Sequence, residues 1–285
     1  MENITKRFGK VTANKDVTLE LYKGEILSLL GENGSGKTTL MNMLSGIYFP
    51  DEGQIYIDGK PVTIASPKDA FALGIGMIHQ HFKLVDVFTA TENIILGMPG
   101  KLNLAEARKK VQEICDRYGF DIDPTQKIYD MSVSQKQTVE IVKLLYRGVD
   151  ILILDEPTAG LDPKERIRIR NLISEVAKDK IVIIATHVVT DVEFIAKEIV
   201  MLSNGKIIRS GSPSKLLKEL DGKVWNIFLS DNEIDEVNTG YKVSNISRDA
   251  DGVIARIIAD SYDGRWQKEA VRPNLEDLYL YLNGD

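Results

Sequence analysis

Short apolar runs alternate with polar and glycine-rich segments along this chain. Residues 26–30, 151–154 and 181–185 are almost wholly apolar. Runs of this kind predict strands that are buried on both faces, as in a parallel sheet. Residues 17–21 and 53–59 instead alternate between apolar and polar side chains, which predicts strands with one solvated face. The pattern therefore predicts an α/β fold with a mixed set of strands.

Helical periodicity appears between several of these strands. Apolar side chains recur every three or four positions in residues 105–118 and 134–146, so both segments are expected to be helices. Together they predict a helical insertion at about residues 86–148. Asp162, which is followed by proline, has the form of a helix start, and helical spacing continues to Val176.

The last part of the chain has a pattern of its own. Residues 223–229 and 253–259 are expected to be strands, and residues 275–282 a final helix. We therefore expect two domains, a main domain over residues 1–221 and a small α+β unit over residues 222–285. We assign no chemistry to the second domain.

A glycine-rich segment follows the first buried run. Residues 31–38, GENGSGKT, match the phosphate-loop pattern G-x-x-x-x-G-K-[ST] without a mismatch, and residues 39–44 have the character of the helix that should follow. Glycines let successive backbone N–H groups converge on an anion at a helix N-terminus. We expect Lys37 to bind the β- and γ-phosphates of a nucleotide and Thr38 to bind magnesium. The nucleotide-binding candidates in this segment are Gly31, Glu32, Asn33, Gly34, Ser35, Gly36, Lys37, Thr38 and Thr39.

Polar side chains end two of the other buried runs. Asp155 and Glu156 follow residues 151–154, and His187 closes the run that starts at Ile181. Ligands bind at the carboxyl ends of parallel strands, so these side chains are expected to face the phosphate loop. Asp155 is then a magnesium ligand, and Glu156 orients or deprotonates the attacking water. Without an intact phosphate loop, solvated acids at a strand end would be the better interpretation.

Composition narrows the choice of function. The 285 residues carry a formal net charge of −6, which argues against a general binder of nucleic acid or of anionic membranes. Cys115 is the only cysteine, and its place on an apolar helix stripe indicates a buried structural thiol. No apolar stretch approaches the roughly 20 residues of a membrane span, and the N-terminus lacks the apolar segment of a signal peptide. We expect a soluble or peripheral protein.

Together these motifs resemble the ATP-binding subunit of an ABC transporter, over residues 1 to about 220. In that family, residues 31–38 correspond to the Walker A motif, residues 151–155 to the Walker B strand and Glu156 to the general base. The resemblance implies a P-loop NTPase cassette with a mixed sheet, an antiparallel β subdomain and a helical insertion. It also implies ATP and Mg²⁺ as cofactors.

Four further residues match motifs of the same family, in the family's order. Phe8 corresponds to the aromatic residue that stacks on adenine, and Gln80 to the glutamine that touches magnesium and the membrane partner. His187 corresponds to the switch histidine that senses the γ-phosphate, and Asp162 to the D-loop. The resemblance therefore adds Phe8, Gln80 and Asp162 to the expected site and assigns a role to His187, which its strand-end position had already placed there.

The signature loop departs from the family pattern. The family usually has Leu-Ser-Gly-Gly-Gln, whereas residues 131–135 are Met-Ser-Val-Ser-Gln. The resemblance implies that Ser132, Ser134 and Gln135 contact the ATP held by another subunit. Because Ser134 carries a side chain where the family has glycine, we expect crowding of the phosphate and slower hydrolysis.

The resemblance also differs along the chain. Residues 74–147 are similar to the N-terminal cassettes of nucleoside or simple-sugar importers, whereas the segment from about residue 158 is similar to single-cassette exporters. One hypothesis is that the chain is a natural or constructed fusion of two parents. Cavities along the shared border of helices 105–118 and 164–177 would support it.

The chain contains one phosphate loop and one signature loop. In the family that it resembles, the phosphate loop of one subunit and the signature loop of another contact the same ATP, so one chain forms only half of the ATPase. The resemblance therefore implies a second ABC cassette, either an identical or a similar subunit, and transmembrane permease subunits as partners. Such a subunit is cytoplasmic and peripheral on the inner face of the cell membrane. We expect ATP hydrolysis that drives transport, with nucleosides or simple sugars as the favoured cargo. The alternatives are an exporter-type ATPase for peptides, drugs or antibiotics, and a cassette that binds ATP but hydrolyses it weakly.

Two other ATPase classes fit the sequence less well. A DNA-maintenance ATPase would carry a long coiled coil between its Walker motifs, but no heptad run lies between Lys37 and Asp155. A ribosome-acting relative would join two cassettes in one chain. No nucleic-acid partner is therefore expected.

Overall fold

The computed structural model describes residues 1–100, 103–249, 252–262 and 264–283. The chain divides into two compact units, the first over residues 1–210 and the second from residue 211 onward. The sequence places the boundary later, at residue 221. The difference arises because the short helix α8 (Pro213–Leu217) packs against α10 (Leu275–Asn283) and so joins the second unit.

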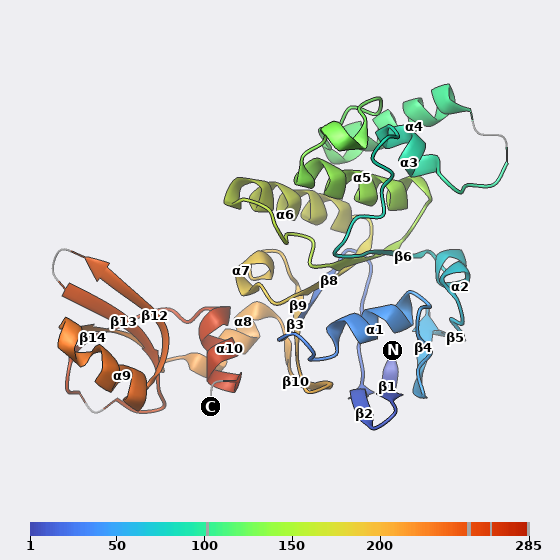
Figure 1. Cartoon of the computed structure of the whole chain (residues 1–285). Helices are drawn as coiled ribbons and strands as arrows, with labels where there is room; N and C mark the ends of the chain where they lie inside the picture. Colours follow the sequence, from blue (N-terminus) through green and yellow to red (C-terminus); the bar gives the residue numbers. More distant parts are fainter. Residues whose placement is uncertain (101–102, 250–251, 263, 284–285) are drawn as a thin grey trace. The chain divides into compact units, whose positions relative to one another are not determined.

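The first unit contains a six-stranded sheet and a four-stranded sheet (Figure 1). The strand order of the six-stranded sheet is β10 (Lys206–Gly211), β9 (Glu198–Ser203), β3 (Ile26–Leu30), β8 (Ile181–Thr186), β7 (Ile151–Asp155) and β6 (Ile75–Ile78). The five strands from β9 to β6 are parallel, since β3 pairs in parallel with β9 and with β8, and β7 pairs in parallel with β8 and with β6. The four-stranded antiparallel sheet has the order β2 (Val11–Val17), β1 (Glu2–Phe8), β4 (Glu52–Ile57) and β5 (Lys60–Val62). The predicted α/β fold with a mixed set of strands is confirmed.

The helices of the first unit agree with the predicted spacing. The helical insertion contains α3, α4 and α5, which pack against one another. The bounds of the helices are α1 (Lys37–Leu44), α2 (Pro67–Ala72), α3 (Ala90–Ile95), α4 (Leu104–Tyr118), η1 (Ile128–Asp130), α5 (Val133–Tyr146), α6 (Pro163–Ala177) and α7 (Val189–Val192). Asp162 caps α6, because its carboxylate accepts a hydrogen bond from the backbone N–H of Glu165.

One predicted strand is absent. Residues 17–21 alternate like a strand, but β2 ends at Val17 and residues 18–21 have no regular structure. Leu19 is nevertheless buried, and its N–H donates to the carbonyl oxygen of Met1. The alternation therefore reflects burial of Leu19 in the core, although residues 18–21 lack the regular backbone pairing that defines a strand.

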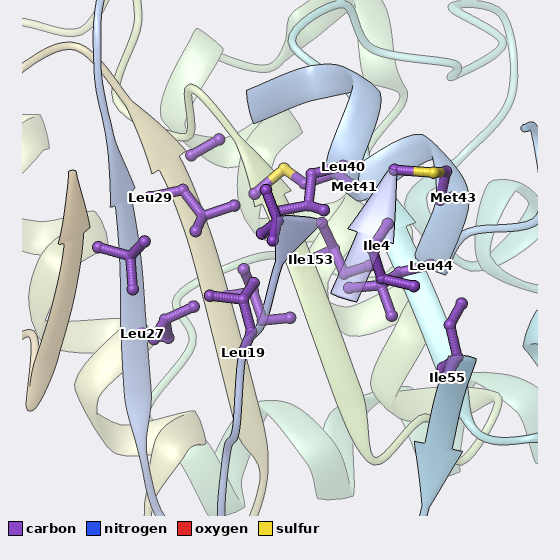
Figure 2. Close-up of a cluster of buried hydrophobic side chains, with 14 of the residues drawn as sticks. Ile4, Leu19, Leu27, Leu29, Leu40, Met41, Met43, Leu44, Ile55 and Ile153 are labelled. Carbon is purple, nitrogen blue, oxygen red and sulfur yellow. The ribbon is translucent and has the colours of Figure 1, made fainter. Parts of the chain in front are cut away.

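The core of the first unit holds α1 between the two sheets (Figure 2). Leu40, Met41 and Met43 of α1 are fully buried, together with Leu29 of β3 and Ile4 of β1. A fully buried aliphatic side chain contributes about 1.5–3 kcal/mol, so this contact fixes the helix firmly. The loop that precedes α1 is thereby held at the edge of the parallel sheet.

The border between α4 and α6 is packed. Both helices bury their apolar stripes, with Val111 and Cys115 on α4 and Ile169 and Ile173 on α6 less than 3 % exposed. Arg117 near the end of α4 also forms an ion pair with Asp179, which follows α6. This packing does not support the fusion hypothesis.

The second unit is a four-stranded antiparallel sheet with helices. Its strand order is β12 (Lys242–Asp249), β13 (Gly252–Ile258), β11 (Val224–Leu229) and β14 (Gln267–Ala270). The other elements are α8 (Pro213–Leu217), η2 (Lys218–Leu220), η3 (Asp231–Glu233), α9 (Ile234–Gly240) and α10 (Leu275–Asn283). The α+β class is confirmed, and the predicted strands and final helix correspond to β11, β13 and α10. The sequence analysis did not predict β12, β14 or α9.

Among the described helices, none combines the length and the apolar character needed to cross a bilayer.

Candidate functional site

A pocket of about 350 Å³ lies at the carboxyl end of the parallel sheet in the first unit. It brings together the phosphate loop, the end of β7 and Gln80, which the sequence analysis had grouped. It is also lined by a stretch of β2 and by the turn between β9 and β10. The lining residues are Val11, Thr12, Ala13, Asn33, Gly34, Gly36, Lys37, Thr38, Thr39, Gln80, Asp155, Glu156, Asn204 and Gly205.

Two glycines of the phosphate loop have no room for a side chain. Gly36 has φ +102°, and a Cβ there would collide with the carbonyl oxygen of Ala13. A Cβ at Gly31 would collide with the carbonyl oxygen of Leu202. The neighbouring strands therefore press directly on the loop backbone, and only glycine allows this approach.

Lys37 lies inside the loop. Its Nζ donates to the carbonyl oxygens of Gly31 and Glu32, at 2.7 and 3.0 Å, and the residue is only 6 % exposed. Burial lowers the pKa of Lys37, while the charges of Glu156 and Asp155 oppose this shift. The ammonium group is thus held at the pocket wall by two backbone carbonyl groups, and its positive charge would attract a phosphate group.

Asp155 ends β7 in a buried position. Burial raises the pKa of its carboxyl group, and the nearby charge of Glu156 raises it further. Lys37 and a hydrogen bond from Thr38 act in the opposite direction. A buried carboxylate whose charge is disfavoured gains from a cation, and Thr38 and Gln80 supply further oxygen atoms in the same pocket.

This donor set fits magnesium. Mg²⁺ is usually bound by one or two carboxylates together with phosphate oxygens and water, and it does not need an all-protein cage. In line with this, no group of three or more His, Cys, Asp and Glu side chains is placed to hold a metal within the described part of the chain. Asp155, Thr38 and Gln80 are the residues that would hold the ion.

Glu156 is clamped by its neighbours on β8. Its Oε2 accepts a hydrogen bond from Thr186 Oγ1 at 3.0 Å, and its Oε1 accepts one from the backbone N–H of His187 at 3.1 Å. The ring Nδ1 of His187 lies 2.8 Å from the same Oε1. Glu156 has φ +50°, a conformation that costs a non-glycine residue about 1 kcal/mol or more. These contacts hold the side chain in place despite the strained backbone.

Phe8 does not line the pocket. It lies at the end of β1, is 43 % exposed and contacts Tyr48 edge-on, with ring centroids 5.1 Å apart. An exposed aromatic ring is available for stacking, but its role toward adenine stays a prediction. Gly31, Glu32 and Ser35 belong to the loop without lining the pocket. Ser35 is buried, and its carbonyl oxygen accepts a hydrogen bond from the N–H of Gly205.

The signature residues lie apart from this pocket, at the start of α5. Ser132 and Gln135 form a capping box, in which Ser132 Oγ accepts from the N–H of Gln135, and Gln135 Oε1 accepts from the N–H of Ser132. Ser134 is only 4 % exposed, and its Oγ donates to Glu165 Oε1 of α6 at 2.7 Å. The side chain at 134 therefore lies inside the subunit, which is not the exposed position that crowding of a phosphate would need.

Two groups of pocket residues were missed by the sequence analysis. Val11, Thr12 and Ala13 lie on β2, and Asn204 and Gly205 form the turn between β9 and β10. The Asn-Gly pair is a recognisable hairpin signal between two apolar runs. Its position beside the phosphate loop is set by tertiary contacts, because Gly205 also accepts a hydrogen bond from the N–H of Lys15 on β2.

Comparisons with known proteins agree with this geometry. Residues 14–159 match a family model described as "ABC transporter". The nucleoside import ATP-binding protein NupA of Lactococcus lactis subsp. cremoris is 50 % identical over 213 residues, which cover 73 % of this chain and 42 % of NupA. The guanosine import ATP-binding protein NupO of Bacillus subtilis is 50 % identical over 183 residues, which cover 63 % of this chain and 36 % of NupO. The chain thus spans less than half the length of either protein.

Solved structures of ATP-binding cassettes have the same fold. A nucleotide-free cassette from an ABC transporter has a TM-score of 0.68 at 27 % identity, with 78 % of this chain and 93 % of the cassette covered. The dimeric cassette MJ0796 in a post-hydrolysis state, bound to ADP and Pi, has a TM-score of 0.63 at 28 % identity. The aligned region covers 74 % of this chain and 97 % of the MJ0796 chain. The predicted cassette fold is confirmed.

The same comparisons bear on the fusion hypothesis. The match to NupA covers 73 % of the chain, so it must continue well beyond residue 158. Similarity to import proteins is therefore present on both sides of the supposed junction. Neither an exporter-like C-terminal part nor a fusion is supported.

Proposed function

The chain belongs to the ABC transporter family of ATP-binding cassettes, and on that premise we propose that it binds and hydrolyses ATP to drive an import system for nucleosides or simple sugars. The cargo is proposed from the relatives, whose names specify nucleoside, guanosine, glucose and ribose import. Import is preferred over the exporter alternative because the names of these relatives all specify import.

One observation carries the proposal: the pocket joins the phosphate loop to the end of β7. Lys37 and Thr38 line the same cavity as Asp155 and Glu156. The loop N–H groups and Lys37 would bind the phosphates of ATP, and Phe8 would stack on its base. Glu32, Asn33, Ser35 and Thr39 complete the loop. The cavity thus combines groups that hold a triphosphate with groups that activate water.

Magnesium would be held by Thr38, Asp155 and Gln80, and when bound it supplies charge neutralisation on the phosphates. This chain contributes the hydroxyl group of Thr38 and the buried carboxylate of Asp155, which line the same pocket. The raised pKa of Asp155 supports this role, since a cation favours the ionised form of the carboxyl group.

Glu156 is the proposed general base. Its carboxylate lies on the pocket wall and is oriented by Thr186 and His187. A base held by two partners can accept a proton from water without searching among rotamers, which is the benefit of pre-organisation. His187 would act on the same water or phosphate through its ring, whose second nitrogen is free of the Glu156 contact.

The proposed active unit is a pair of cassettes. Ser132 and Gln135 lie apart from the pocket of their own subunit, so they would serve the ATP of a second cassette, whereas the side chain of Ser134 is buried against Glu165. Asp162 would lie at the same interface. The dimeric form of MJ0796 supports this arrangement. Permease subunits would be the membrane partners, with this chain on the cytoplasmic face, and Gln80 would transmit the motion to them.

The test is ATP hydrolysis by the purified chain across a range of protein concentrations, with and without magnesium. We expect specific activity to rise with protein concentration, because two subunits complete each site, and to vanish in Lys37→Ala. The Lys60→Ala variant, on the exposed strand β5, is the matched control and should keep full activity. Activity that is independent of magnesium, or equal in Lys37→Ala, would refute the ATPase proposal.

The cargo needs a separate test. Cells that lack this chain should lose ATP-dependent uptake of radiolabelled nucleosides or of simple sugars, and the wild-type chain should restore it while Lys37→Ala should not. Normal uptake of both classes in such cells would refute the proposed cargo and leave the ATPase proposal standing.

A further inference from the structure

Three side chains link the signature loop to the helix that follows Asp162. Ser132 Oγ lies 3.1 Å from Ser134 Oγ, and Ser134 Oγ lies 2.7 Å from Glu165 Oε1. The chain of contacts crosses from α5 to α6, and Ser134 in its centre is 4 % exposed. Both ends are anchored, since Ser132 caps α5 and the N–H of Glu165 donates to Asp162.

The direction of these hydrogen bonds follows from donor chemistry. A carboxylate oxygen accepts, so Ser134 must give its single hydroxyl hydrogen to Glu165. The oxygen of Ser134 can then only accept, and Ser132 is the donor in the 3.1 Å contact. Ser132 Oγ in turn accepts the N–H of Gln135. The one hydrogen of the Ser132 hydroxyl is therefore engaged inside its own subunit.

This contact is not needed to shape the loop. The capping box with Gln135 already fixes Ser132 at the start of α5, through bonds in both directions. A glycine at position 134 would leave that box intact. What Ser134 adds is an acceptor for the hydroxyl hydrogen of Ser132.

We propose that Ser134 and Glu165 form an internal restraint that withholds the Ser132 hydroxyl from the ATP phosphate presented by a second cassette. This inference rests on the proposed function, because that function supplies the second cassette and its ATP. The restraint weakens the association of the two cassettes without abolishing it, since the positive end of the α5 helix dipole still attracts a phosphate. The effect of position 134 is thus exerted by its hydroxyl group and not by its bulk.

The size of the effect follows from one hydrogen bond at each site. A net hydrogen bond changes an equilibrium about fivefold. A symmetric dimer contains two such sites, so removal of both restraints should strengthen ATP-driven association roughly 25-fold.

Two substitutions at position 134 distinguish the effect of the hydroxyl group from the effect of side-chain size. Ser134→Ala removes the hydroxyl and keeps Cβ, whereas Ser134→Gly removes both. Each is combined with Glu156→Gln to suppress turnover, and the dissociation constant of the dimer in magnesium and ATP is measured by sedimentation. We expect both variants to lower this constant by about the same factor, roughly 25-fold. A change in Ser134→Gly alone would indicate crowding by the side chain, and no change in Ser134→Ala would equally overturn the inference.

Two further variants exclude a merely structural effect. Glu165→Ala, on the other helix, should also strengthen association, because Ser134 can then donate to Ser132 and release the Ser132 hydrogen. Adding Ser132→Ala to Ser134→Ala should cancel the gain, because the released donor is gone. A gain that persists without Ser132 would overturn the inference. Thermal unfolding of each variant reports whether it is folded.

The same experiment keeps the two proposals apart. A Glu156→Gln parent that binds ATP and forms no ATP-dependent dimer at any concentration would contradict the proposed function. A parent that dimerises, with the same dissociation constant after Ser134→Ala, would contradict only the restraint.

Discussion

The ring Nδ1 of His187 and the carboxylate Oε1 of Glu156 lie 2.8 Å apart at the ends of two neighbouring strands. The contact is a consequence of register, because Asp155 of β7 pairs with Ala185 of β8. Beyond this pair the chain reaches Glu156 directly after the end of β7 and His187 directly after the end of β8, so the two polar side chains lie at the same edge of the sheet. Glu156 is therefore part of an oriented pair and not a solvated acid at a strand end.

Glu156→Gln should abolish turnover while nucleotide binding is retained. The amide cannot accept a proton from water at neutral pH, and loss of a general base lowers rates about 10²–10⁴-fold. The phosphate loop is untouched, so the affinity for ATP should stay near that of the wild type. Steady-state hydrolysis and binding of a fluorescent ATP analogue measure the two quantities.

A matched control for Glu156→Gln is Glu113→Gln, on the exposed face of α4. It makes the same chemical change far from the pocket lining and should leave hydrolysis unchanged. Turnover close to wild type in Glu156→Gln would remove Glu156 from the role of base.

Asp155→Asn should stabilise the nucleotide-free protein. Burial, followed by the charge of Glu156, raises the pKa of Asp155 above its ordinary value of 3.8. A carboxyl group whose pKa is raised by folding destabilises the folded state once it is ionised, and this penalty grows as the pH rises from the ordinary pKa through the raised one. The neutral amide removes it, and Tm without nucleotide should rise by a few degrees.

The same substitution should weaken magnesium-dependent binding of ATP, since a carboxylate ligand is lost. Stability and function are then opposed at one residue, as is common in active sites. Differential scanning calorimetry at pH 7 and at pH 4 tests the argument, because the gain should shrink at the lower pH. A lower Tm for Asp155→Asn at pH 7 would contradict it.

The residues that could be predicted from sequence are those whose signal is local. The phosphate loop is a contiguous pattern, and the runs 26–30, 151–154 and 181–185 are buried on both faces, so periodicity and motif agree. Topology then brings their carboxyl ends together, so the positions of Asp155 and Glu156 beside Lys37 follow from the sequence.

The residues that could not be predicted depend on tertiary contacts. Ala13 and Gly205 reach the pocket because β2 and the β9–β10 turn press on Gly36 and Ser35, and no local pattern encodes that approach. The direction of the Ser134 side chain is decided by Glu165, which is 31 residues away in the chain. The sequence shows that residue 134 carries a side chain, but it does not show that this side chain is buried.

Cys115 should be unreactive in the folded protein. The thiol is fully buried on α4, and burial raises its pKa from 9.0 to about 11. At pH 8 the reactive thiolate is thereby reduced roughly a hundredfold, in addition to the loss of access. Mass spectrometry after treatment with iodoacetamide should detect no adduct without denaturant and one adduct in urea.

A Glu113→Cys variant provides the comparison for Cys115, because it places a thiol on the exposed face of the same helix. It should take up one label rapidly under native conditions. Equally rapid labelling of the wild-type chain would show that α4 opens readily or that the thiol is not buried in solution.

Asp277→Ala should strongly destabilise the second unit. Asp277 is 0 % exposed, and its carboxylate accepts hydrogen bonds from Ser244, from the backbone N–H of Asn274 and from both Nε and Nη2 of Arg256. Removing one partner of a buried pair leaves an uncompensated charge and costs about 3–5 kcal/mol. Urea unfolding followed by the fluorescence of Trp225 and Trp266, which both belong to this unit, measures the loss.

The control for this last change is another ion pair of the same unit, between Arg248 and Asp231. Both of its side chains are about two-thirds exposed or more, and such pairs contribute about 0–1 kcal/mol. Asp231→Ala should therefore shift the urea midpoint only slightly, although it breaks a contact of the same chemical kind. If the two variants unfolded at the same urea concentration, burial of Asp277 would not be the source of its contribution to stability.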